Sequence, residues 1–184
     1  IPMASLLGYT NAGKSTLFNA LSDARVEVED QLFSTLDPVT RRIRLPSGAE
    51  LLLTDTVGFI QKLSPAVVAA FRATLEELSQ SDVLLHLIDV THPKALEQTE
   101  VVEDPLEDLG LLDMPRLLVL NKMDLMPENT DVESSAVLPG SARAGSDRLP
   151  KVLISAAKGW NIGNLLEKIE SQLIALDGPL TVSQ

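Results

Sequence analysis

Short, almost continuous runs of apolar residues alternate along this chain with longer segments in which apolar residues recur every three or four positions. The short runs are typical of strands covered on both faces, and the longer segments are typical of amphipathic helices. The pattern predicts strands at residues 4–7, 83–88, 117–120 and 152–154, and helices at residues 16–21, 64–78, 94–109 and 161–173. Strands separated by helices indicate a parallel sheet with right-handed crossovers.

A different pattern lies between the first two helical segments. Residues 40–45 alternate, with Ile43 and Leu45 on one face, and a turn at residues 46–48 leads into a second strand at residues 51–53. Two strands joined in this way predict an antiparallel hairpin. The expected fold class is therefore α/β, with three α/β/α layers around a six-stranded, mostly parallel sheet that has one antiparallel edge strand.

Three segments depart from the regular alternation. Residues 22–38 are polar without a clear period and are interpreted as a loop. Pro105 lies inside the third helical segment, so we expect a kink or a restart there, with Asp104 as a candidate cap. Residues 126–150 are rich in Ser, Gly, Ala, Pro and acids, and we expect a weakly structured segment with a short or frayed helix and a mobile loop at residues 140–148.

The composition excludes several classes of protein. The 184 residues suffice for one core, and the net charge of −11 argues against general nucleic-acid binding, which needs clustered Lys and Arg. The absence of Cys excludes disulfides, and no apolar run approaches the length of a membrane span. We expect a monomeric cytoplasmic domain without membrane contact, with an organellar matrix or stroma left open. Two groups of side chains are interpreted as structural: the basic cluster of Arg41, Arg42 and Arg44 on the solvated face of an edge strand, and the histidines His86 and His92.

Residues 8–15 read Gly-Tyr-Thr-Asn-Ala-Gly-Lys-Ser, a complete G-x-x-x-x-G-K-S phosphate loop between a predicted strand and a predicted helix. Glycine permits backbone angles that a side chain would penalise, so the turn can aim its amides at phosphate oxygens. Lys14 can reach the β- and γ-phosphates, and Ser15 offers a hydroxyl to Mg²⁺. A chance glycine-rich turn is disfavoured because further motifs follow in the expected order. The predicted phosphate-binding residues are Gly8, Asn11, Ala12, Gly13, Lys14, Ser15 and Thr16.

The sequence Asn121-Lys122-Met123-Asp124 follows a predicted buried strand and matches the N-K-x-D motif of GTPases. Asp124 can accept from both guanine N1–H and the exocyclic amine, which adenine does not present in that arrangement. Asn121 would brace the phosphate loop, and the stem of Lys122 would lie on the plane of the base. Ser155, Ala156 and Ala157 resemble the S-A-K element that contacts guanine through its backbone, although Lys158 comes one residue late. These motifs favour GTP and GDP as ligands.

The sequence Asp55-Thr56-Val57-Gly58 ends a predicted strand, as the D-x-x-G motif requires. Asp55 would hold Mg²⁺ through water, and the amide of Gly58 would bind the γ-phosphate. Thr35, in the polar loop, is the candidate switch threonine that closes on Mg²⁺, and Ser34 is its competitor. The predicted metal ligands are Ser15, Thr35 and Asp55, and the predicted catalytic residues are Lys14, Thr35, Gly58 and Asn11.

Together with Asp30-Gln31-Leu32-Phe33-Ser34-Thr35-Leu36-Asp37-Pro38, these motifs resemble the GTPase domain of the HflX family. The stretches D-x-L-F-x-T-L-D-P and D-T-V-G-F-I carry the most family-specific part of the resemblance. The resemblance implies a translation-factor-class GTPase that binds the large ribosomal subunit and can split ribosomes, with an N-terminal domain and a helical linker. Because Ile1-Pro2-Met3 leads straight into a strand, residues 1–184 are expected to be a single GTPase domain from a longer protein.

Two positions bear on hydrolysis. Phe59 stands where small signalling GTPases have the glutamine that orients the attacking water, so unaided hydrolysis is expected to be slow. Phe59 is equally well interpreted as an ordinary core residue of the switch helix, and the two interpretations are compatible. Several related GTPases with Asn at the position of Asn11 hold K⁺ beside the phosphates, so K⁺ is an expected cofactor besides Mg²⁺.

The leading hypothesis is a GTP-driven switch that is slow alone and is stimulated by the large ribosomal subunit. The alternatives are an RNA-modification or ribosome-assembly GTPase and a GTP-dependent docking module without significant turnover. An ATPase is disfavoured by Asp124, whose carboxylate would lack donors on adenine.

Overall fold

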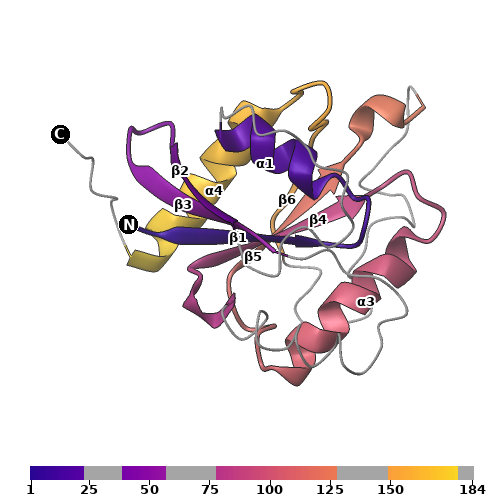
Figure 1. Ribbon diagram of the computed structural model, residues 1–184, viewed down its shortest axis with the longest axis horizontal. Coiled ribbons are helices and arrows are strands. Elements are labelled where there is room, and N and C mark those ends of the chain that lie inside the picture. The colour runs from indigo at the N-terminus through magenta and orange to yellow at the C-terminus, as the bar shows by residue number, and fades with distance from the viewer. Residues whose placement is uncertain (23–38, 57–77, 128–148, 178–184) are drawn as a thin grey trace.

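A single sheet runs through the computed structural model, which describes residues 1–22, 39–56, 78–127 and 149–177 (Figure 1). The six strands have the spatial order β2-β3-β1-β4-β5-β6, and every pair is parallel except β2 with β3. This confirms the predicted fold class. The strands are β1 (Met3–Gly8), β2 (Val39–Arg44), β3 (Glu50–Asp55), β4 (Val83–Asp89), β5 (Arg116–Asn121) and β6 (Lys151–Leu153).

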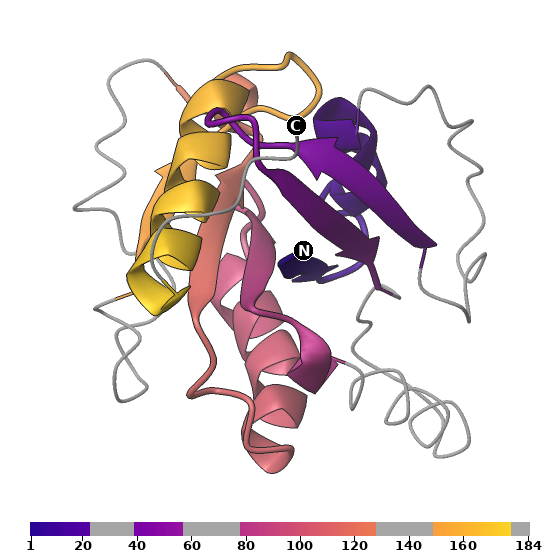
Figure 2. The same ribbon diagram turned by 90° about the vertical axis from the view of Figure 1, so that its left-hand side faces the viewer.

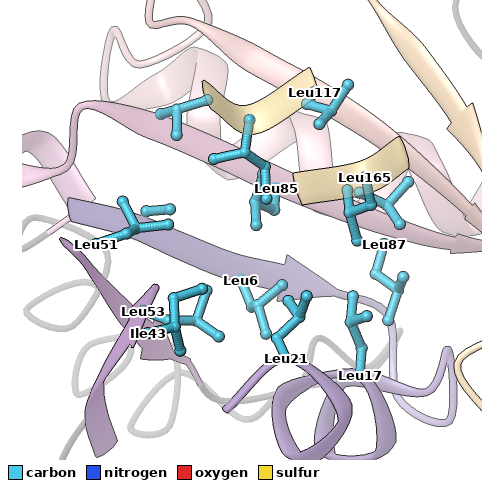
Figure 3. Packing of buried hydrophobic residues seen from close by; sticks show 14 of the residues in the cluster. Leu6, Leu17, Leu21, Ile43, Leu51, Leu53, Leu85, Leu87, Leu117 and Leu165 are labelled. Atoms are coloured by element: carbon cyan, nitrogen blue, oxygen red, sulfur yellow. The ribbon is translucent and has the colours of Figure 1, made fainter. Parts of the chain in front are cut away.

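Helices cover both faces of the sheet, so the architecture has three layers (Figure 2). On one face, α1 (Lys14–Ser22) and α4 (Ile162–Asp177) bury their apolar sides against alternate residues of the central strands. Leu17 and Leu21 of α1 and Leu165 of α4 point toward Leu6, Leu53 and Leu87 of the strands in Figure 3. On the other face, α3 (Ala95–Asp108) packs Val102 and Leu106 against Leu7 and Leu84.

The predicted hairpin is present as β2 and β3, and its core-facing residues Ile43 and Leu45 are buried. The basic cluster on β2 was predicted to lie on a solvated face, which holds for Arg42 and Arg44 but is wrong for Arg41. Because side chains alternate along a strand, Arg41 shares the inner face with Ile43. Its guanidinium lies over the ring of Phe18, 5.9 Å from the centroid.

The helix α3 is one continuous element of 14 residues, so the expected restart at Pro105 is wrong. Asp104 consequently lies within the helix and does not cap a second one. Pro105 removes only one helical donor, and it lies in the last turn of the helix. Burial of Val102 and Leu106 on the same face carries the helix past this position.

The last helix begins after Asn161, as predicted. The carbonyl of Asn161 accepts from the amide of Leu165 at 3.1 Å, and its side-chain amide donates to the carbonyl of Leu153 at 2.7 Å, tying the start of α4 to β6. The predicted inward side of this helix is confirmed, because Leu165, Ile169 and Leu173 are buried and Ile162 and Leu166 pack against them. None of the helices in the described ranges is long and apolar enough to cross a bilayer.

Three predicted segments fall outside the described residues. These are the polar loop over residues 23–38, most of the helix predicted at residues 64–78, and the bulk of the segment 126–150 with its loop at residues 140–148. The short 3₁₀ helix η1 (Leu78–Gln80) follows the second of them and leads into β4.

A buried polar group lies on the α3 face of the sheet. Arg116 at the start of β5 pairs with Glu103 of α3 at 3.0 Å, and the side chains are 4% and 5% exposed. His86 of β4 is fully buried, and this burial, together with the nearby Arg116 charge, lowers its pKa to about 3. The imidazole is therefore neutral at physiological pH, in line with the structural role predicted for His86.

Candidate nucleotide-binding site

The phosphate loop connects β1 to α1 in a tight turn. The amide of Ala12 donates to the carbonyl of Tyr9 at 3.1 Å, and Asn11 adopts a left-handed backbone with φ 67°. Gly8 lies against β4, where a Cβ atom would come within 2.8 Å of the Leu87 carbonyl oxygen. The turn therefore lies close to the carboxyl ends of β1 and β4.

Asn121 braces this loop, as predicted. Its side-chain amide donates to the carbonyl of Ala12 at 2.8 Å, and its side-chain oxygen accepts from the amide of Ala156 at 3.0 Å. Gly13, with φ 103°, lies so close that a Cβ atom there would be 2.4 Å from the Asn121 amide nitrogen. One buried asparagine thus fixes the phosphate loop, the end of β5 and the loop after β6 relative to one another.

Lys122 extends from the end of β5 to the phosphate loop. Its backbone is left-handed with φ 71°, and its ammonium donates to the carbonyl of Asn11 at 3.0 Å. The same ammonium lies 3.0 Å from a carboxylate oxygen of Asp89, at the end of β4. Sequence reasoning missed Asp89, although its place directly after a buried apolar run was visible in the sequence.

Asp124 lies in the short helix η2 (Met123–Leu125), and its carboxylate is held from the loop after β6. The hydroxyl of Ser155 donates to Asp124 Oδ1 at 2.8 Å and accepts from the amide of Lys158 at 3.1 Å. The amide of Met123 also donates to the carbonyl of Ile154 at 3.1 Å. Ser155 and Ala156 therefore join the base motif through their hydroxyl and amide, while Ala157 is exposed beside them.

Lys14 and Asp55 meet across the ends of β1 and β3. The ammonium of Lys14 lies 2.9 Å from Asp55 Oδ1 and also donates to the carbonyl of Thr56. Thr56 is itself fixed, because its hydroxyl donates to the carbonyl of Leu6 at 2.6 Å. Ser15 and Thr16 are exposed at the start of α1, next to this pair.

The predicted residues Thr35, Ser34, Gly58 and Phe59 lie outside the described part of the chain. The residues brought together at the carboxyl edge of the sheet are Gly8, Asn11, Ala12, Gly13, Lys14, Ser15, Thr16, Asp55, Asn121, Lys122, Asp124, Ser155, Ala156 and Ala157. The described ranges contain no cluster of three His, Cys, Asp or Glu side chains that would hold a metal by itself.

A model of the family described as "50S ribosome-binding GTPase" matches residues 3–122. This span runs from β1 through the phosphate loop to the first two residues of the base motif. The chain belongs to the 50S ribosome-binding GTPase family. This family accounts for the G-domain motifs of the chain.

Proteins named GTPase HflX are similar to this chain. The one from Caldanaerobacter subterraneus subsp. tengcongensis is 49% identical over 173 residues, covering 94% of this chain and 37% of that protein. The one from Escherichia coli strain K12 is 43% identical over 173 residues, covering 94% of this chain and 39% of that protein. The predicted HflX resemblance is therefore confirmed, and the chain spans less than half the length of these relatives.

Solved structures of GTPases share the fold. A GTP-binding protein from the archaeon Sulfolobus solfataricus in complex with GDP superposes with a TM-score of 0.77 and 31% identity, covering 96% of this chain and 53% of that one. Era in complex with MgGDPNP and a segment of 16S ribosomal RNA superposes with a TM-score of 0.68 and 26% identity, covering 91% of this chain and 55% of that one.

Proposed function

We propose that residues 1–184 form a single GTPase domain, part of a longer ribosome-associated protein of the cytoplasm or an organelle matrix. The observation that carries this proposal is the position of Asp124. Its carboxylate is fixed by Ser155, and the loop that bears it is tied to the phosphate loop through Asn121 and Lys122. A base-selecting carboxylate and a phosphate-binding lysine are thus parts of one connected site.

Asp124 is suited to select guanine. A carboxylate has four acceptor positions on two oxygens, and Ser155 uses one of them on Oδ1. The remaining positions can accept from guanine N1–H and the exocyclic amine together. Adenine offers neither donor in that arrangement, so its binding would leave the remaining acceptor positions of a desolvated carboxylate unfilled, which is costly.

Lys14, Asp55 and Ser15 are suited to hold a Mg²⁺ nucleotide. The ammonium of Lys14 lies 2.9 Å from Asp55 Oδ1, which supports a site in which both groups act on the same Mg²⁺ nucleotide. Hydroxyl and carboxylate oxygens are the ligands that Mg²⁺ prefers, so the donor set fits. Ser15 and Asp55 would hold the ion, and the ion would offset the negative charge of the phosphates. The phosphates would compete with Asp55 for the ammonium of Lys14, and Thr35 and the amide of Gly58 remain the predicted further ligands of the Mg²⁺ and the γ-phosphate.

The ribosome is the proposed trigger of hydrolysis. Phe59 has no group that orients water, so we expect the chain alone to turn over GTP slowly and the large ribosomal subunit to accelerate it by about tenfold or more. The measurement is phosphate release at saturating GTP with 50S subunits, with 30S subunits and with neither.

The Lys14→Ala variant serves as the control in that assay, because it removes the phosphate-binding cation and exposes any contaminating GTPase. Equal turnover with 50S and with 30S subunits would contradict the proposal that the large ribosomal subunit triggers hydrolysis. Binding of GTP with no turnover in any arm would instead favour the docking module.

Potassium is the proposed second cation, held beside the phosphates by Asn11. We expect turnover to be several times faster in KCl than in NaCl at equal ionic strength. The Asn11→Gly variant removes the side chain while glycine accommodates the left-handed backbone at φ 67°, so it should lose the difference between the two salts. A variant that keeps the potassium effect would show that Asn11 does not hold the ion.

A further inference from the structure

Asp89 belongs to none of the nucleotide-binding motifs, yet it is among the most constrained side chains near the site. It ends β4, and both of its carboxylate oxygens are engaged. Oδ1 accepts from the amide of Thr91 at 2.9 Å and from its hydroxyl at 2.6 Å, while Oδ2 pairs with the ammonium of Lys122 at 3.0 Å. The Asp89 side chain is 11% exposed and the Lys122 side chain 31%, so the carboxylate is the more shielded partner of this contact.

These contacts connect the ends of β4 and β5 to the loop that follows β1. The register of the sheet places Asp89 opposite Asn121, so the carboxylate lies beside the residue that follows in the base motif. From there the ammonium of Lys122 reaches the carbonyl of Asn11 at 3.0 Å. Thr91 and Asp89 therefore anchor Lys122 from the side of β4, and Asn11 holds it from the side of β1.

A lysine needs such an anchor to lie in one place. Its four-carbon stem is flexible, and a single neutral carbonyl would hold the ammonium only weakly. Burial alone would raise the pKa of Asp89, but the hydrogen bonds from Thr91 and Lys122 outweigh this and leave the pKa below its usual value. Asp89 is thus ionised at neutral pH and supplies the stronger, charge-assisted partner.

We propose that Asp89 is a positioning residue of the nucleotide site, which keeps Lys122 extended between the base loop and the phosphate loop so that its stem forms one wall for the purine. The inference rests on the proposed guanine-nucleotide function. A stem lying on the face of the base does not sense the groups on its edge. Loss of Asp89 should therefore weaken binding of different purines by the same factor, unlike loss of Asp124.

The test compares the full chain with its Asp89→Asn and Asp82→Asn variants. Asp89→Asn keeps the shape and an acceptor for Thr91 but removes the charge that holds Lys122. Asp82→Asn is the matched control, because Asp82 lies beside the opposite end of β4 and accepts from the amide of Met3 at 2.8 Å. Release of fluorescent GDP, chased with unlabelled GDP, should be about tenfold faster in Asp89→Asn, the size expected for one charge-assisted bond, and unchanged in Asp82→Asn.

Two further readouts separate positioning from a general structural role. Affinities for GDP and for inosine diphosphate, which lacks the exocyclic amine, should fall by the same factor in Asp89→Asn. In a Lys122→Met background, Asp89→Asn should have no further effect on release. The inference would be overturned if Asp89→Asn released GDP at the wild-type rate, or if it changed the ratio of the affinities for GDP and inosine diphosphate. It would also be overturned if Asp89→Asn accelerated release in the Lys122→Met background as much as it does in the wild-type chain. Failure of the wild-type chain to bind GDP would instead overturn the proposed function, and the inference with it.

Discussion

Replacing Asp124 by asparagine should transfer the preference of the site from guanine to xanthine. The asparagine amide keeps only one acceptor oxygen, and its NH₂ group would face a donor on guanine but an acceptor on xanthine. We expect the affinity for GDP to fall by about 10⁴, the factor by which sites built for a hydrogen bond reject an unmatched ligand, and xanthosine diphosphate to become the better ligand. Isothermal titration calorimetry with both nucleotides measures the shift.

The geometry suggests that this substitution leaves the loop in place. Ser155 donates to Asp124 Oδ1 at 2.8 Å, and an asparagine oxygen at that position can accept the same bond. Asp113→Asn is the matched control, because Asp113 is exposed and lies outside the site, and it should bind GDP as the wild-type chain does. If Asp124→Asn kept the wild-type preference for guanine over xanthine, the role assigned to Asp124 would be wrong.

Replacing Gly13 by alanine should abolish nucleotide binding at concentrations that saturate the wild-type chain. The added Cβ atom would lie 2.4 Å from the amide nitrogen of Asn121, and the backbone at φ 103° already disfavours any side chain. Asn121 would have to move, which breaks its bonds to the carbonyl of Ala12 and the amide of Ala156 together. We expect a loss of at least about 100-fold in GDP affinity, since two bonds to buried groups are lost.

Gly110→Ala separates this effect from the general cost of alanine at a left-handed position. Gly110 has φ 69°, and a Cβ atom there would meet nothing within 4 Å. This variant should lose about 1–2 kcal/mol of folding stability and keep its affinity for GDP. Chemical denaturation and GDP titration of both variants provide the comparison. Near-normal GDP binding by Gly13→Ala would contradict the bracing role of Asn121.

The sequence was sufficient to predict those parts of the site that consist of contiguous residues. The phosphate loop and the base motif each combine several residues at fixed spacing, and each follows an apolar run that forms a buried strand. The apolar runs and the alternating hairpin likewise determined the sheet, because period and burial follow directly from the geometry of strands and helices.

The contacts between distant segments were not predictable in this way. The pairing of Asp89 with Lys122 depends on the register between β4 and β5, which no local pattern specifies. The contact of Arg41 with the ring of Phe18 was also not predictable, because it depends on how α1 packs against the inner face of β2. The restart expected at Pro105 does not occur, because tertiary burial of the neighbouring apolar residues outweighs one lost helical bond.

The most direct measurement is a calorimetric titration of the chain with GDP and with ADP in the presence of Mg²⁺. The site holds a carboxylate that matches guanine and a lysine that matches the phosphates, so GDP should bind and ADP should bind about 10⁴-fold more weakly. Equal affinities for the two nucleotides would show that Asp124 does not select the base and would contradict the account.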